Sequence, residues 1–204
     1  KRPPHLFGGF AQYMYLPWNA VVHHVPKGVT AELAGLVTPM ANGVEWSLMD
    51  GGVGYNSTVL IQGPGQQGLS QTVICKQAGA SLIIVTGTSK DGARLRVAKE
   101  LGADHTIDVN REDPLARIRE ITGGKGVPFA LDAVGGDTGQ EALAALGPRG
   151  RLIVYGALSM QPTPIDPRAL IVGSKSVEGF WLKEWIEEQG LLKKFLLMRR
   201  LVKM

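Results

Sequence analysis

The sequence predicts an α/β protein with a doubly wound, six-stranded parallel sheet, preceded by a short β-rich segment. Three observations support this prediction. Short runs of aliphatic and β-branched residues begin near positions 58, 81, 105, 128, 151 and 176. Helix-compatible segments separate these runs, and a glycine-rich turn directly follows the first of them. Strands that alternate with helices form parallel sheets that are covered on both faces.

The composition is that of an ordinary globular protein. The chain has 204 residues, of which 44% are hydrophobic and 20% are charged, enough for one well-buried domain or for one domain and part of another. No apolar run reaches the ~20 residues that a membrane-spanning helix needs. The single cysteine, Cys75, excludes an internal disulfide and fits a reducing compartment, so we expect a cytoplasmic protein.

The positive charge is concentrated at the end of the chain. The net charge is +4, but residues 191–204 contain five basic and no acidic side chains. The main body therefore lacks the basic surface of a nucleic-acid-binding protein. The tail is either a basic amphipathic helix for a membrane or RNA, or a surface helix that covers the core. We expect the second, with neither nucleic acid nor a membrane as a partner.

The first 27 residues differ from the rest of the chain in their pattern of apolar and polar positions. Apolar and polar positions alternate within residues 1–27, which predicts short antiparallel strands. Thr30 is a suitable N-cap for a short helix, and a second helix is predicted from about Met40 to Met49, after Pro39. The spacing of the nearby histidines does not match that of metal ligands, so we expect them to be structural; they are His5, His23 and His24.

The glycine-rich turn has the spacing G-x-G-x-x-G and follows the predicted strand Thr58–Gln62. Gly63 would allow the tight turn, and Gly65 would let backbone N–H groups approach a pyrophosphate. Gly68 would let the next helix pack on the sheet, with Gln66 and Gln67 in its first turn. The spacing alone also fits an ordinary turn, but its position between a strand and a helix favours a dinucleotide site and a Rossmann sheet of order 3-2-1-4-5-6.

The remaining elements follow with local stop and start signals. Gly102 should end one helix at C′, Asp113 and Pro114 should start the next, and Thr138 and Glu141 should form a capping box. The further predicted strands are Ser81–Thr86, His105–Val109, Pro128–Ala133, Arg151–Tyr155 and Ser176–Phe180. The predicted helices are Gly65–Gln77, Ala93–Leu101, one from Asp113, one from Thr138 to about Leu146, a short one near Ala169 and a last region from Lys183.

Several segments resemble one known group of enzymes. These are Gly8–Tyr13, Val37–Ala41, Ala98–Asp104, Gly123–Val127, Asp132–Gly136 and Gly179–Leu182 with Trp185. Together they resemble the medium-chain dehydrogenase/reductase superfamily, which includes zinc-type alcohol dehydrogenases and quinone or enoyl reductases. The resemblance divides the chain into a remnant of the GroES-like catalytic domain and hinge (1–37), a Rossmann domain (38–182) and a helical segment (183–204).

The resemblance implies hydride transfer between a nicotinamide cofactor and a small alcohol, carbonyl or activated alkene. Most of the family's catalytic domain would precede Gly8, and Thr38 stands where zinc-dependent relatives have a glutamate. We therefore expect no zinc in this chain, and the sequence identifies no catalytic residue. Two interpretations stay open, a cofactor-binding core of an oxidoreductase and a non-catalytic nucleotide-binding or dimerisation module; a Rossmann-type methyltransferase fits less well.

The ribose end of the site should lie at the end of the second strand. NAD-specific proteins carry an acid there, whereas this chain has Gly87, followed by Thr88, Ser89 and Lys90, with Arg94 one turn later. Hydroxyls and cations could receive a 2′-phosphate, so NADP is expected over NAD. The alternative is that Lys90 and Arg94 are ordinary surface charges.

Two further expectations depend on the resemblance. Backbone groups after the fourth and fifth strands should hold the nicotinamide carboxamide; these residues are Val134, Gly135, Tyr155, Gly156 and Ala157, with Tyr155 equally suited to packing. The last strand, residues 176–181, carries aromatics rather than blunting lysines or prolines, which predicts a homodimer through this edge. The alternative is a monomer in which the following helix covers that edge.

Overall fold

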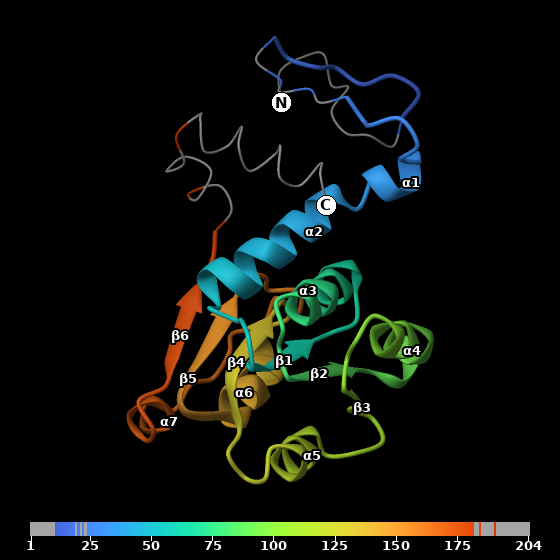
Figure 1. Cartoon of the computed structure of the whole chain (residues 1–204). Helices are drawn as coiled ribbons and strands as arrows, with labels where there is room; N and C mark the ends of the chain where they lie inside the picture. Colours follow the sequence, from blue (N-terminus) through green and yellow to red (C-terminus); the bar gives the residue numbers. More distant parts are fainter. Residues whose placement is uncertain are drawn as a thin grey trace.

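The computed structural model describes residues 11–18, 20, 22, 24–181, 184 and 190. Its centre is a six-stranded parallel sheet with strand order β3-β2-β1-β4-β5-β6 (Figure 1), which confirms the predicted fold class and order. The strands are β1 (Thr58–Gln62), β2 (Leu82–Gly87), β3 (His105–Asp108), β4 (Val127–Asp132), β5 (Leu146–Val154) and β6 (Ser176–Gly179).

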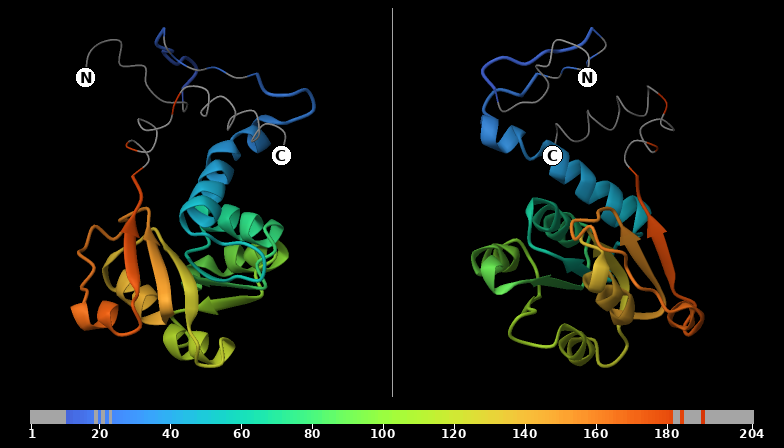
Figure 2. Two further views of the ribbon diagram at one scale, coloured as in Figure 1. Left: turned by 60° about the vertical axis from the view of Figure 1, so that its left-hand side comes forward. Right: turned by 180° about the vertical axis from the view of Figure 1, so that it is seen from behind.

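Helices cover both faces of this sheet, as Figure 2 shows from two sides. One face carries α3 (Gln66–Gln77) and α4 (Gly92–Glu100), and the other carries α5 (Pro114–Ile121) and α6 (Gly136–Ala145). The short helix α7 (Pro167–Ile171) precedes β6. This arrangement follows from the chain order, because each parallel connection must cross over one face of the sheet.

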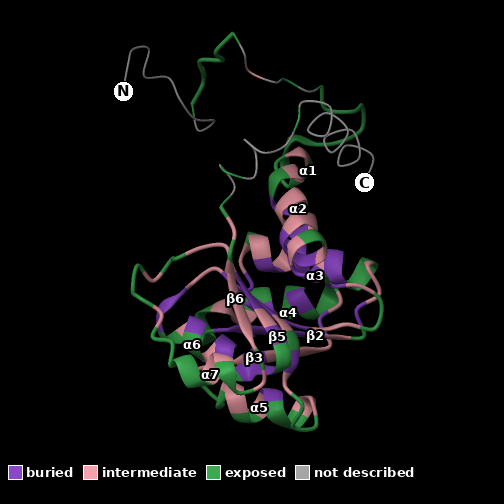
Figure 3. Cartoon of the chain, turned by 90° about the vertical axis from the view of Figure 1, so that its left-hand side faces the viewer, coloured by how far each residue is buried: buried purple, intermediate pink, exposed green. Residues whose placement is uncertain are grey.

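The core forms two layers, one on each side of the sheet. Within β2, Ile83 and Val85 belong to the layer under α3 and α4, whereas Ile84 belongs to the layer under α5 and α6. All three side chains are fully buried. Figure 3 shows the same distribution, with buried residues gathered in the sheet and on the inner sides of the helices. Burial on both faces explains why these strands have continuous apolar runs rather than alternation.

The helix before the sheet is longer than predicted and starts earlier. Thr30 accepts a hydrogen bond from the Leu33 N–H (3.3 Å) and caps α1 (Ala31–Ala34), as expected. Helix α2 (Val37–Gly43) continues as a π-helix, η1 (Val44–Asp50), so the predicted start at Met40 is wrong. Pro39 lies within the first turn of α2, where its missing N–H costs no helical hydrogen bond.

The continuous helix formed by α2 and η1 packs on α3. A Cβ atom on Gly43 would lie 3.3 Å from the backbone of Ser70, so the small residue allows close approach. Further along, Trp46 stacks on Tyr155 with ring centroids 4.0 Å apart and meets Phe180 edge-on. These aromatic contacts connect the helix to the chain that follows β5 and β6.

Three other local predictions are wrong. Thr138 and Glu141 do not form a capping box, because α6 begins two residues earlier, after the left-handed residue Gly135 (φ 71°). Strand β5 begins at Leu146 rather than Arg151, and a register irregularity between Val127 and Phe129 accommodates the extra length. The described residues between positions 11 and 30 form no strand, contrary to the short antiparallel strands predicted within residues 1–27, of which residues 1–10 lie outside the described part.

The predicted helix from Lys183, the basic tail and the histidines His5 and His23 lie outside the described residues, apart from single positions in the helix. Within the described part, no helix is long and apolar enough to cross a membrane.

Cys75 provides a test of this packing. Its side chain is 0% exposed on α3, and burial raises the pKa of the thiol to about 11. We expect native protein to react with a thiol reagent such as DTNB at pH 8 far more slowly than protein unfolded in urea, since the thiolate is the reactive form. Rapid reaction of the native protein would contradict the described packing of α3.

Candidate functional site

The ends of five strands meet along the carboxyl edge of the sheet. In the strand register, Gln62 pairs with Thr86, Gly87 with Asp108, and Asp132 with Val154. The residues that follow β1, β2, β4 and β5 therefore lie at the same edge. These are the segments that contain all the residues predicted to bind a cofactor.

The glycine turn after β1 has the geometry expected of a dinucleotide site. Gly63 adopts φ 89°, a conformation that L side chains rarely take. A Cβ atom on Gly68 would lie 1.9 Å from the carbonyl oxygen of Gly63, so only glycine allows α3 to start this close to the strand. Helix α3 then runs from Gln66, with its N-terminus at the turn.

The space around Gly65 fits an anion such as a pyrophosphate. Gly65 is the N-cap of α3 with extended backbone, and no protein atom lies within 4 Å of the position that its Cβ would occupy. No hydrogen-bonding side chain caps α3 within the described residues. The first turn, with Gln66 and Gln67, therefore presents backbone N–H groups and the positive end of the helix to open space.

The end of β2 is shaped by packing against this turn. A Cβ atom on Gly87 would lie 2.9 Å from Cδ of Pro64 and 3.1 Å from Cδ2 of Leu95. A carboxylate side chain at position 87 therefore has no room while Pro64 occupies the turn. The absence of an acid at this position, which favoured NADP in the sequence, has a steric cause.

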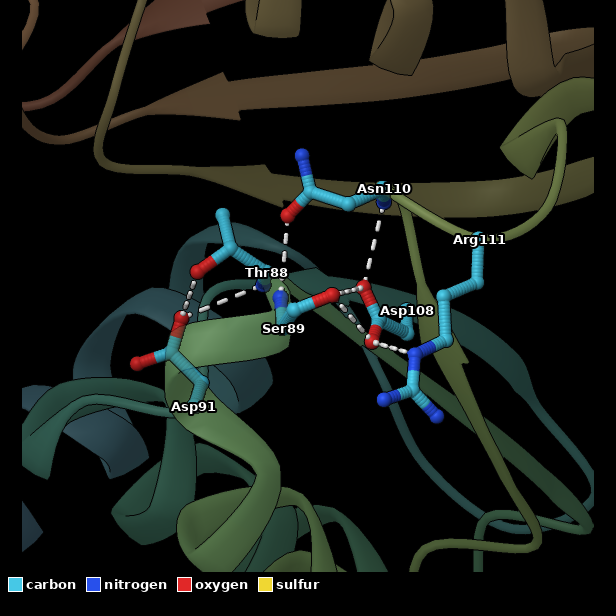
Figure 4. A network of polar contacts seen from close by, with 6 residues as sticks. All are labelled: Thr88, Ser89, Asp91, Asp108, Asn110 and Arg111. Carbon is cyan, nitrogen blue, oxygen red and sulfur yellow. Dashed lines mark hydrogen bonds and ion pairs between the residues drawn. The ribbon is translucent and has the colours of Figure 1, made fainter.

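The residues after β2 form a polar network with the residues after β3 (Figure 4). The Thr88 hydroxyl donates to the Asp91 carboxylate (2.7 Å), which also accepts the Thr88 N–H (3.1 Å). The Ser89 hydroxyl donates to Asp108 (2.8 Å), and the Ser89 N–H donates to Oδ1 of Asn110 (2.9 Å). Two carboxylates thus lie close to the predicted ribose position.

The two predicted cations of this region differ in their surroundings. The Arg94 guanidinium lies 3.2 Å from Asp91, whose pKa is lowered chiefly by the hydrogen bond from Thr88. Lys90 lies in a short 3₁₀ turn, η2 (Ser89–Asp91), and is exposed without an ion-pair partner among the described residues. Asp91 occupies the N-cap position of α4, but its side chain turns back to Thr88 instead of capping that helix.

At the other end of the edge, Asp132 fastens the turn between β4 and α6. Its fully buried carboxylate accepts the N–H groups of Val134 (2.8 Å) and Gly135 (3.1 Å). Burial raises the pKa of Asp132, and these two hydrogen bonds act in the opposite direction. The charge therefore holds the backbone of two residues that were predicted to contact the nicotinamide.

The loop after β5 is joined to the same turn. The N–H groups of Leu158 and Ser159 donate to the carbonyls of Ala133 (3.1 Å) and Val134 (2.9 Å). A Cβ atom on Gly156 would lie 2.7 Å from the Ala133 carbonyl, so glycine permits this approach. The loop that contains Gly156 and the exposed Ala157 thus packs against the turn that contains Val134 and Gly135.

Tyr155 has a packing role. Its ring stacks on Trp46, its hydroxyl donates to Oε1 of Gln71 (3.3 Å), and burial raises its pKa to about 12. Of the two alternatives for this side chain, the structure favours packing. Its backbone remains at the strand end.

A cavity of about 220 Å³ runs along the carboxyl edge between the ends of β1 and β2 and the helices α5 and α6. It is lined by residues from these four elements and the loops beside them: Leu60, Gln62, Gly63, Thr86, Gly87, Thr88, Asp91, Val109, Pro114, Leu115, Ile118, Val134, Thr138 and Glu141. A second hollow, of about 500 Å³, lies between the start of α6 and the loop containing Ser159 and Gln161. Apolar walls with a few polar groups are typical of small-molecule sites.

Comparison with known proteins identifies the family. A model of the zinc-binding dehydrogenase family matches residues 68–196. The chain belongs to this family. The match confirms the resemblance to medium-chain dehydrogenases and reductases. In the part of the chain that the structure describes, no three His, Cys, Asp or Glu side chains are grouped to hold a metal ion.

Relatives of the family cover the same region. A probable alcohol dehydrogenase of Mycobacterium tuberculosis is 34% identical over 157 residues, which are 76% of this chain and 43% of that protein. The solved benzyl alcohol dehydrogenase of Acinetobacter calcoaceticus has a TM-score of 0.69 at 34% identity and the same shares of coverage. A 2-haloacrylate reductase has a TM-score of 0.76 at 29% identity, with 88% and 56% covered. The chain thus spans about half the length of its relatives.

Several residues at this edge were not predicted from the sequence. Asp108 at the end of β3 and Asn110 after it accept hydrogen bonds from Ser89, and Arg111 pairs with Asp108. Asp132 fixes the turn after β4. Their position could have been inferred, because polar residues directly after parallel strands collect at one edge. The contact between Pro64 and Gly87 joins two loops, and local patterns carry no signal for it.

The close contact of Gly68 gives a direct test of this geometry. Gly68→Ala should destabilise the fold by more than ~3 kcal/mol, because the new methyl group meets backbone rather than a movable side chain. Gly92→Ala, on α4, is the matched control: no atom lies within 4 Å of its Cβ position, and we expect a stabilisation of up to about 1 kcal/mol. Urea unfolding measures both, and equal stabilities would contradict the described turn.

Proposed function

We propose that this chain is the cofactor-binding part of an NAD(P)(H)-dependent oxidoreductase that transfers hydride to or from a small alcohol, carbonyl or activated alkene. The observation that carries the proposal is the turn at Gly63–Gly68, where glycine is required by backbone contact at Gly68 and open space surrounds Gly65. Membership of a dehydrogenase family and relatives with alcohol dehydrogenase or reductase names support it.

Different segments at the carboxyl edge would bind different parts of a dinucleotide. The N-terminus of α3 would bind the pyrophosphate, and the segment Gly87–Ser89 would face the adenosine ribose. Val134, Gly135, Gly156 and Ala157 would position the nicotinamide, which supplies the hydride chemistry when bound. The protein's contribution is orientation and exclusion of water, and Asp132 supports it by fixing the turn after β4.

The sequence led us to expect NADP(H) over NAD(H), and this proposal keeps only part of the argument for that preference. Lys90 remains available for a 2′-phosphate, whereas Arg94 has Asp91 as its partner. Gly87, the other argument for NADP, is explained by its contact with Pro64. Both cofactors therefore belong in the first binding experiments.

We also propose a homodimer through β6 and the residues that follow it to position 181. Strand β6 is the last in the sheet order and pairs only with β5 within the described chain. Glu178 is the charged residue of β6, and it forms an ion pair with Arg151 of β5 (2.6 Å). Its charge is therefore balanced within the sheet, and the outer backbone groups of β6 are suited to continue the ladder.

Dinucleotide binding at the glycine turn is tested by Gly65→Val. The new side chain would enter the open space without meeting protein atoms, so we expect a folded variant that binds NADH and NADPH at least about tenfold more weakly, the equivalent of one hydrogen bond to a charged group. Gly54→Val, also in open space but before β1, is the control. Fluorescence titration with unchanged affinity in folded Gly65→Val would overturn the proposal.

The dimer is tested by light scattering and by Val177→Pro. The Phe180 N–H donates to the Val154 carbonyl of β5. Because N–H groups alternate in direction along a strand, that of Val177 points to the outer edge. We expect a mass near twice 21.9 kDa for the parent chain, and monomer or insoluble protein for Val177→Pro. A parent mass of one chain at micromolar and higher concentrations would exclude the dimer.

A further inference from the structure

Every hydrogen-bond donor of Thr88 and Ser89 already has an acceptor within the protein. The N–H and O–H groups of Thr88 both donate to Asp91. The Ser89 N–H donates to Asn110, and the Ser89 O–H donates to Asp108. These two residues stand at the end of β2, where the adenosine ribose of a dinucleotide would lie (Figure 4).

The two hydroxyl oxygens can therefore only accept a further hydrogen bond. A hydroxyl has one proton and two lone pairs, and an ionised carboxylate accepts without donating. The free 2′-hydroxyl of a ribose can donate to such an oxygen. A phosphate group at neutral pH offers acceptors almost exclusively, so a 2′-phosphate finds no donor on Thr88 or Ser89 unless the network breaks.

The charged side chains around Thr88 and Ser89 also disfavour a 2′-phosphate. Asp91 and Asp108 are each paired with one arginine at 3.2 Å, Arg94 and Arg111 respectively. Both arginines are exposed, whereas the side chains of the two carboxylates are only about a fifth exposed. A 2′-phosphate would add negative charge beside two carboxylates whose cations are already in use, which leaves Lys90 as the remaining cation of this segment.

The cavity beside this network provides an independent sign of a ligand. Gly87, Thr88 and Asp91 line it together with Gln62, which is 5% exposed. The Gln62 side chain donates to the Thr138 carbonyl (3.0 Å), while its Oε1 atom has no hydrogen-bond partner among the described residues. An unpaired buried acceptor in the wall of an apolar cavity is the arrangement that a ligand with N–H or O–H donors would complete.

We infer that the site selects the unphosphorylated ribose, and hence NAD(H), through Thr88 and Ser89 held by Asp91 and Asp108. The inference rests on the proposed function, since it concerns the same cofactor site. It reverses the preference expected from the sequence. NAD-specific proteins carry an acid at the end of β2, and Pro64 leaves no room for one here. We assign its role to Asp91 on η2 and Asp108 on β3, which accept hydrogen bonds from the hydroxyls of Thr88 and Ser89 and leave the two hydroxyl oxygens as acceptors for the ribose.

The experiment compares two fragments that lack the nicotinamide, ADP-ribose and 2′-phospho-ADP-ribose, by isothermal titration calorimetry on the chain as it stands. We expect ADP-ribose to bind at least about tenfold more tightly, because the charged 2′-phosphate would be left without donors beside two carboxylates. Equal or tighter binding of 2′-phospho-ADP-ribose overturns this inference and leaves the proposed function intact. Failure of both fragments to bind overturns the two together.

Variants test the named residues. The double variant Asp91→Asn/Asp108→Asn removes both charges and frees donors, so the ratio of the two dissociation constants should shift toward 2′-phospho-ADP-ribose by about tenfold or more. Glu120→Gln, the same change at an exposed carboxylate near the far end of α5, should leave the ratio unchanged. Where the double variant does not fold, Ser89→Ala serves instead and should weaken ADP-ribose selectively. An unchanged ratio in the folded variants contradicts the assignment.

Discussion

The contact between Gly68 and the carbonyl of Gly63 is the constraint on which the site depends. It places the first turn of α3 against the end of β1, at a distance that any side chain at position 68 would prevent. The same contact directs the N-terminus of α3 toward the space around Gly65, and it seats Pro64 against Gly87 on the neighbouring strand. One backbone approach thus sets both the pyrophosphate position and the shape of the ribose end. The rest of the sheet supplies the rigid frame that holds these parts in register.

The two ends of the carboxyl edge are held by different kinds of interaction. After β4 and β5, backbone hydrogen bonds and one buried carboxylate, Asp132, fasten two loops to each other. After β2 and β3, exposed or partly exposed side chains form a polar network that includes Ser89 and Asp108. Loops joined by backbone hydrogen bonds tolerate little change in geometry, whereas single substitutions can change the partners within a network of side-chain hydrogen bonds. Cofactor selection is therefore expected to be more easily altered than the binding of the dinucleotide as such.

Much of the fold follows from the sequence, because the central strands β1 and β2 are rich in apolar residues and several helices are bounded by local signals. Asp113 and Pro114 begin α5 as predicted, and the order of the sheet follows from the position of the glycine turn in the first unit. The failures lie where a tertiary contact overrides the local pattern. Two left-handed glycines start α6 before the expected capping box, and packing on α3 and Tyr155 extends the helix around Trp46. At the site, the glycines could be predicted, but the steric reason for Gly87 could not, since it depends on Pro64 and Leu95 from other segments. The pair between Arg94 and Asp91 is different, because its spacing of three residues can be read from the sequence.

The most direct measurement of the central claim, that the carboxyl edge of this sheet is a dinucleotide site, is a ¹⁵N NMR titration of the chain with ADP-ribose. The account predicts saturable shifts of the amide resonances of Gly65, Gln66 and Gln67, together with those of Thr88 and Ser89, while amides at the opposite edge, such as Gly54 and Ser81, stay in place. Shifts confined to residues outside the carboxyl edge, or none at millimolar ligand, would contradict it.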